Sequence, residues 1–134
     1  MQGDHAVARD EVDAYLAAVP EPQRGTLMIV RARILDVLHD PEDSLTGRQP
    51  EECITYGIPT VKVEGRSIAG YAAYTRHCSY FPMSGAVLGK LEAELVGYIT
   101  SRGTLRFAVD APLSAELVRQ LVRARQQDVL ARGR

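Results

Sequence analysis

Cysteine is scarce in this sequence, and the motifs that usually reveal a reaction are missing. The only cysteines are Cys53 and Cys78, and they do not form a C-x-x-C pair. We therefore expect two free thiols in a reducing compartment rather than a disulfide. The sequence also lacks a G-x-S-x-G elbow, an H-E-x-x-H helix, a phosphate-binding loop, a G-x-G-x-x-G turn and a calcium loop. No reaction can be assigned from a motif.

Long hydrophobic runs and an excess of charge are lacking too. The apolar runs are far too short to span a bilayer, and the N-terminus has no basic patch followed by an apolar core. The sequence therefore predicts a cytoplasmic protein without a membrane partner. With 16 basic and 17 acidic residues, the net charge is -1 and the pI is about 6.3. We expect no nucleic-acid partner, because no overall field attracts the chain to polyanions.

The composition is that of one soluble globular domain. Of the 134 residues, 46% are hydrophobic and 25% are charged, which suffices for a core without disulfides or structural metal. We predict a single domain over residues 1–134, with flexible ends at 1–8 and 131–134.

Helical spacing of apolar residues predicts four helices. The first begins at the capping residue Asp10 and ends at Pro20, and the second runs from Pro22 to Asp40. The third begins after Ser84, and the last follows 112–114. We read residues 40–50 and 97–103 as loops.

Alternating residues between the second and third helices predict strands in residues 52–56, 61–64, 67–75 and 77–81, and residues 104–109 predict another. Gly65 permits a tight reversal, and strands joined by tight turns are antiparallel. The expected order is ααβββ(β)αβα, an α+β fold with an antiparallel sheet of about four to five strands covered by helices.

Strand parity separates the residues with reactive side chains. His77, Ser79 and Phe81 should share one face, whereas Cys78 and Tyr80 should share the other. The adjacency of His77 and Cys78 therefore argues against a catalytic dyad.

The tyrosines allow two interpretations. Tyr56, Tyr71 and Tyr80 could line a pocket together with His77, or they could be half-buried residues whose hydroxyls reach water. Small residues at 69, 70, 72 and 73 leave room for either a ligand or a packed helix. The sequence does not choose between these alternatives.

Charged residues suggest further sites, each with a simpler explanation. Arg102 beside Gly103 could bind a carboxylate or phosphate, or be an exposed loop residue. Arginines on the last helix could form a basic patch or a solvated face. One histidine is too few to fix a metal, although carboxylates could complete an iron site. The acidic group that could bind metal, or compensate a helix dipole, is Asp4, His5, Asp10, Glu11 and Asp13.

Several segments together resemble a known family. They are Glu52 to Pro59, the Gly65 turn, Tyr71 to Pro82, Gly103 to Phe107 and Pro112 to Arg125. In this order they resemble the bacterial YdhG-like domains of unknown function called DUF1801. Arg102 stands where that family usually has lysine, which keeps the charge but alters its geometry.

The resemblance implies an α+β sheet covered by helices, and one branch of the family is described as frataxin-like intracellular iron chaperones. Tyr56, His77, Tyr80 and Arg102 fall on family-motif positions, and with Tyr71 they form the predicted ligand-binding set. No catalytic residue follows from the likeness, because fold alone does not carry function.

Three functional hypotheses remain. The first and favoured one is a non-enzymatic protein that binds a small ligand or iron. The second is an enzyme for a small anionic substrate, with His77 as acid or base and Arg102 as anchor. The third is an interaction module in which an exposed sheet edge forms a homodimer.

Overall fold

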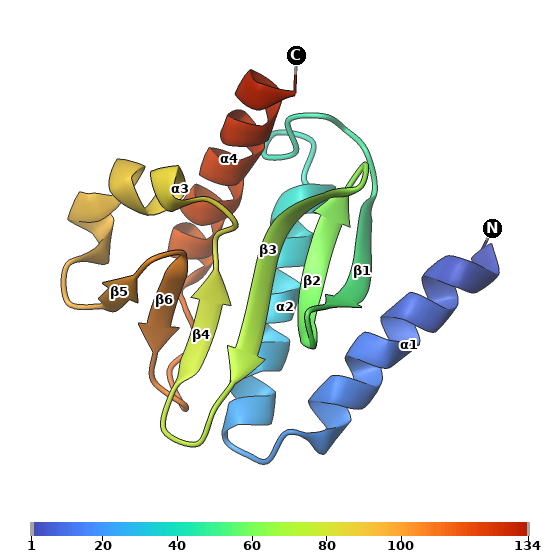
Figure 1. The fold of residues 1–134 in the computed structure, drawn as a ribbon, viewed down its shortest axis with the longest axis vertical. Coiled ribbons are helices and arrows are strands. Elements are labelled where there is room, and N and C mark those ends of the chain that lie inside the picture. Colours follow the sequence, from blue (N-terminus) through green and yellow to red (C-terminus); the bar gives the residue numbers. More distant parts are fainter. Residues whose placement is uncertain (1, 134) are drawn as a thin grey trace.

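The structure is a computed structural model that describes residues 2–133, and the side chains from Val7 onward. Helices α1 (Gln2–Ala18) and α2 (Gln23–His39) come first. Strands β1 (Pro50–Thr55), β2 (Ile58–Val63), β3 (Arg66–Ala73) and β4 (Cys78–Phe81) follow. Helix α3 (Gly85–Lys90) and the 3₁₀ turn η1 (Glu92–Leu95) precede β5 (Ile99–Ser101) and β6 (Thr104–Phe107), and α4 (Ala115–Arg132) ends the order. The predicted α+β class is confirmed (Figure 1).

The strands form one antiparallel sheet in the order β1-β2-β3-β4-β6-β5. Two-residue turns join its first three strands, and Tyr56-Gly57 and Glu64-Gly65 adopt positive φ at both positions. Such turns match the twist of the flanking strands and fix their register. Since β6 pairs with β4, the last hairpin extends the sheet away from β1.

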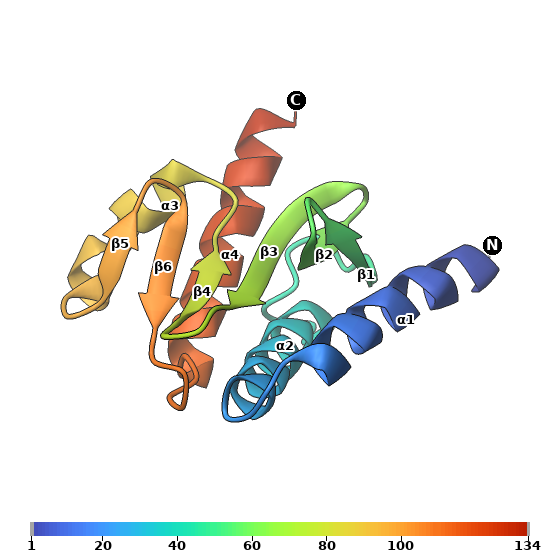
Figure 2. The ribbon, with the colours of Figure 1, turned by 60° about the horizontal axis from the view of Figure 1, so that its bottom comes forward.

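Helices α2 and α4 lie side by side behind the sheet, and α1 runs along β1 (Figure 1). In the turned view, α1 and α2 lie on the same side of the sheet (Figure 2). Ser84 and Ser114 cap α3 and α4, because each hydroxyl oxygen accepts a hydrogen bond from a backbone N–H of the first turn. The two caps start these helices where the sequence predicts.

The core lies between the sheet and the helices. Cys78 and Tyr80 share one face of β4 as expected, and both are completely buried and pair with Phe107 and Leu105 of β6. Tyr71 is buried directly opposite Tyr80. Apolar side chains of the helices cover this layer: Val12, Leu16, Leu27, Val30, Ile34, Leu117, Val118, Leu121 and Val122.

The predicted strand count was too low. The sheet has six strands because Ile99–Ser101, read as part of a loop, pairs with Thr104–Phe107 across the turn Arg102-Gly103. Three residues are too few to show alternation in the sequence. Pairing with Thr104–Phe107 therefore makes residues 99–101 a strand, which their own sequence does not predict.

Two helix boundaries also differ from prediction. Helix α1 begins at Gln2, so Asp10 lies inside it and caps nothing. No proline interrupts residues 2–9, so the helix extends across them. Most of the predicted flexible ends, 1–8 and 131–134, is thus helical, and their mobility stays a prediction. The third helix stops at Lys90, after Gly89, and continues as the 3₁₀ turn η1.

Candidate functional site

The five residues predicted to bind a ligand lie in separate places. Tyr56 is fully exposed in the β1–β2 turn, and Arg102 is exposed in the β5–β6 turn. Tyr71 and Tyr80 lie in the core, while His77 is half-buried just before β4. The structure therefore does not gather them into one pocket.

The buried tyrosines have the character of core residues. Burial raises the pKa of both phenols above the ordinary value. Neither hydroxyl has a hydrogen-bond partner within the described part of the chain. Tyr71 and Tyr80 therefore pack as adjacent inward side chains of the core.

His77 does line a cleft. The cleft has a volume of about 540 Å³ and lies at the end of β4 and β6, between the β5 segment and the loop before α4. Its charged and aromatic residues are Arg76, His77, Tyr98, Arg106 and Phe107. Its remaining lining residues are small or apolar: Gly97, Ile99, Ala108, Ala111 and Pro112.

Sheet pairing explains why Arg106 belongs beside His77. Arg106 of β6 is opposite Ser79 of β4, and Ser79 shares its face with His77 two residues earlier. Arg106 is exposed, whereas its neighbours Leu105 and Phe107 face the core. Alternation along β6 directs Arg106 outward, but only the β4–β6 pairing places it near His77.

The cleft is electropositive. Partial burial of His77, and next the positive charge of Arg106, lower the pKa of its imidazole below the usual 6.5. At neutral pH the ring is therefore mainly uncharged and can accept a hydrogen bond. None of the described residues that line the cleft carries a carboxylate. Arg76 and Arg106 thus provide its formal charge.

A supported turn holds His77 in place. The backbone N–H of Tyr74 donates to the carbonyl of His77 (2.9 Å), and the two rings stack with centroids 5.0 Å apart. From α2, the buried Gln23 donates through Nε2 to the carbonyls of Tyr74 and Thr75 (3.1 and 3.2 Å). These bonds anchor the turn to the helix layer, so the imidazole has a defined position.

The thiols are free and lie outside the cleft. Cys78 is buried on the inward face, and burial raises its pKa to about 11. A thiolate is the nucleophilic form of cysteine, so Cys78 is unreactive at neutral pH. This agrees with the parity argument against a His77–Cys78 dyad.

A metal site is not assembled among the described side chains. In this part of the chain no three His, Cys, Asp or Glu residues lie together in a way that could hold an ion. Of the predicted acidic group, Asp13 forms an ion pair with Arg31 (2.8 Å), and the side chains of Asp4 and His5 lie outside the described set. Iron binding stays a prediction.

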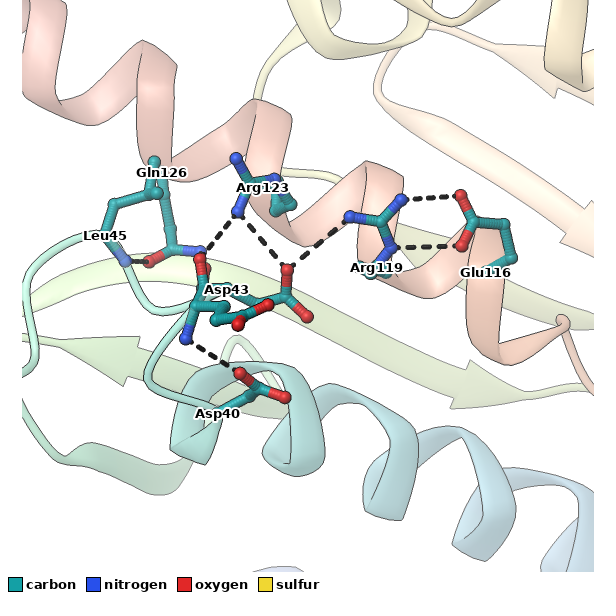
Figure 3. A network of polar contacts seen from close by, with 8 residues as sticks. Asp40, Asp43, Leu45, Glu116, Arg119, Arg123 and Gln126 are labelled. Atoms are coloured by element: carbon teal, nitrogen blue, oxygen red, sulfur yellow. Dashed lines mark hydrogen bonds and ion pairs between the residues drawn. The ribbon is translucent and has the colours of Figure 1, made fainter.

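The arginines of α4 are occupied by protein partners. Asp43, in the loop after α2, contacts both Arg119 and Arg123 (3.5 and 3.3 Å), and Glu116 also pairs with Arg119 (Figure 3). Further along the helix, Arg125 and Arg132 share Asp128. These ion pairs neutralise the described arginines of α4 within the fold, and the contacts with Asp43 tie the loop to α4.

None of the described helices combines the length and the apolar character that crossing a membrane requires. No family model and no curated protein matches the sequence. Among solved structures, the chain is similar to the crystal structure of YdhG, a DUF1801-family protein from Bacillus subtilis, with a TM-score of 0.71 and 17% sequence identity over 92% of each chain. Likeness at this identity concerns the fold. The protein therefore has a YdhG-like, DUF1801-type fold.

Proposed function

We propose that this protein binds a small organic anion in the cleft at His77. The observation that carries the proposal is the charge of the lining, where the described residues include Arg76, His77 and Arg106 but no carboxylate. Elsewhere, arginines such as Arg31 and Arg119 have acidic partners. A guanidinium without an acidic neighbour in a cleft favours an anionic ligand.

The cleft also suggests the rest of the ligand. Phe107, Ile99 and Pro112 provide apolar surface beside the charged groups, and a volume of about 540 Å³ accommodates a small molecule. We therefore expect a compact carboxylate or phosphate with an apolar portion. Carboxylates and phosphates share an anionic group, and the ligand titration described below distinguishes between them.

Binding fits the cleft better than catalysis. In the part of the chain that the structure describes, the lining contains no Ser, Thr, Cys, Asp or Glu that could act as a nucleophile or orient His77. The ring contact of His77 is the stack on Tyr74. The lowered pKa of His77 nevertheless favours one enzymatic alternative, in which the neutral imidazole acts as base and Arg106 takes the anchoring role expected of Arg102.

Ligand titration followed by NMR tests the proposal. Benzoate and inorganic phosphate represent the two anion classes, and benzylamine is the cationic control. We expect one of the anions to shift the resonances of His77 and Arg106, and benzylamine to leave them unchanged. Arg106→Gln should weaken anion binding at least about tenfold, since a charged hydrogen bond contributes about 1.5–3 kcal/mol.

Arg48→Gln is the matched control, because it removes the same charge from an exposed arginine outside the cleft. Equal losses in Arg48→Gln and Arg106→Gln would mean that anions respond only to net charge, and the cleft would be rejected as a site. For the enzymatic alternative, turnover of an anionic substrate must be lost in His77→Gln. Turnover that survives this substitution would exclude His77 as the base.

A further inference from the structure

Strand β5 is an open edge of the sheet with an unusual surface. It forms the outer strand beyond β6 (Figures 1 and 2), and all three of its residues are exposed. Large apolar side chains are exposed there, with Ile99 of the strand at 65% and Val96, three residues before it, at 81%. The strand itself carries no charge, proline or bulge, which are devices that commonly protect an edge from pairing.

The hairpin geometry defines which backbone groups face outward. In a two-residue hairpin the closing pair, here Ser101 and Thr104, exchanges both hydrogen bonds. Alternation then directs the N–H and C=O of Thr100 away from β6. One residue at the centre of β5 thus presents a donor and an acceptor to an incoming strand.

We propose that β5 pairs with β5 of a second copy of this chain around a twofold axis at Thr100. Antiparallel pairing places Thr100 opposite itself, so that each copy donates one bond and accepts one. Ile99 then lies opposite the partner's Ser101, and Tyr98 lies near the partner's Arg102. No like charges meet across the axis.

The proposed register at Thr100 favours a second copy of this chain over an arbitrary strand as the partner. The central residues are neutral, and the single cation, Arg102, meets the aromatic ring of Tyr98 rather than another arginine. A guanidinium over a tyrosine ring is attractive. The strand is therefore complementary to itself, as an isologous contact requires.

The pairing also completes the His77 cleft, a point that rests on the proposed function. Tyr98 and Ile99 line that cleft, so the partner's Arg102 would arrive at its rim. Within one chain, Arg102 is in the β5–β6 turn and does not line the cleft. The dimer would thus supply a further guanidinium for the anion. By linkage, anion binding should then strengthen the dimer.

Sedimentation at increasing concentration tests the dimer. We expect an average mass that rises from 14.7 kDa towards twice that value, with weak association because the edge is short. Thr100→Lys opposes two ammonium groups on the axis and should weaken association at least about tenfold. Thr100→Pro removes the outward N–H and should do the same. Thr100→Val is the control and should still associate.

A monomer at all concentrations, or a dimer that is unaffected by both Thr100→Lys and Thr100→Pro, would overturn the pairing. Circular dichroism of each variant checks that the monomer remains folded. Because Thr100 is exposed, the lysine variant should retain its structure, which keeps the test valid if the proline variant does not fold.

Titration with the better of the two anions tests the shared cleft. Arg102→Gln should weaken binding in the dimeric protein but not in the monomeric Thr100→Lys background. Equal weakening in both backgrounds, or no weakening in the dimer, would reject the shared cleft while leaving the binding proposal intact. Anion binding that is unaffected by Arg106→Gln would instead reject the proposed function, whatever the state of association.

Discussion

The two edges of the sheet differ in how they are protected. At one edge, α1 runs along β1, and Arg31 of α2 joins the two by bonding to Asp13 of α1 and Glu52 of β1. At the other edge, β5 is exposed along its whole length. The first edge is closed by a helix and a half-buried ion pair, whereas the second is available for contact.

The difference indicates where the fold is stabilised and where it can interact. The α1 edge buries apolar residues such as Leu16, and none of its described residues lines the His77 cleft. The β5 edge contributes Tyr98 and Ile99 to that cleft. Stability should therefore depend strongly on the α1 edge, whereas ligand binding and association should depend on the β5 edge.

The largest expected effect is on the α1 edge. Leu16 is 3% exposed, so Leu16→Ala leaves a cavity and should lower the free energy of unfolding by about 3 kcal/mol. Ile99→Ala is the matched truncation at the other edge, where the side chain is 65% exposed, and it should cost less than about 0.5 kcal/mol. Urea unfolding of dilute protein compares them. Equal losses of unfolding free energy in Leu16→Ala and Ile99→Ala would contradict the difference between the two edges.

An intermediate effect is expected from the ion pair that joins α1 to β1. Nε and Nη2 of Arg31 donate to the two carboxylate oxygens of Glu52 (2.6 and 3.2 Å). Burial alone would lower the pKa of Arg31, but the hydrogen bond and charge of Glu52 raise it above the usual value. Glu52→Gln should cost about 2 kcal/mol, because it leaves a half-buried guanidinium with Asp13 alone.

Glu64→Gln provides the control for this prediction. Glu64 pairs with Arg48 at 3.5 Å on the surface, where both side chains are more than half exposed, and such pairs contribute little. Urea unfolding should show a loss below about 0.5 kcal/mol for this variant. If Glu52→Gln is no more harmful than Glu64→Gln, the ion pair does not close the α1 edge.

Much of the fold could be predicted because its signals are local. Ser84 and Ser114 cap helices, Gly65 reverses the chain, and alternation places Tyr80 inward and His77 on the opposite side. Each of these features depends on residues within a few positions of one another. The composition of a short segment is enough to encode them.

The candidate site was harder to predict, because it depends on pairing between distant segments. Arg106 reaches the His77 cleft only because β6 pairs with β4, across an intervening helix and the β5 strand. Arg102 is four residues away and has the same charge, yet the cleft does not include it. The sequence identified Arg102, just before β6, as the candidate arginine, but the register of the β4–β6 pair places Arg106 in the cleft.

The smallest expected effect is on the pKa of His77, which tests the cleft at the β5 edge. Partial burial, followed by the charge of Arg106, lowers its pKa below 6.5. The folded protein thus disfavours the imidazolium, so this group's contribution to stability is greatest above pH 6.5 and is lost as the pH falls towards the lowered pKa.

NMR should show the pKa of His77 rising in Arg106→Gln, because one of the two causes has been removed. Arg48→Gln, which removes a charge outside the cleft, should leave it unchanged. A bound anion should also raise the pKa of His77, since it stabilises the imidazolium, and anion affinity should correspondingly increase as the pH falls through this range. If the pKa of His77 responds equally to Arg106→Gln and Arg48→Gln, the histidine senses only the net charge of the protein, and the electropositive cleft loses its main support.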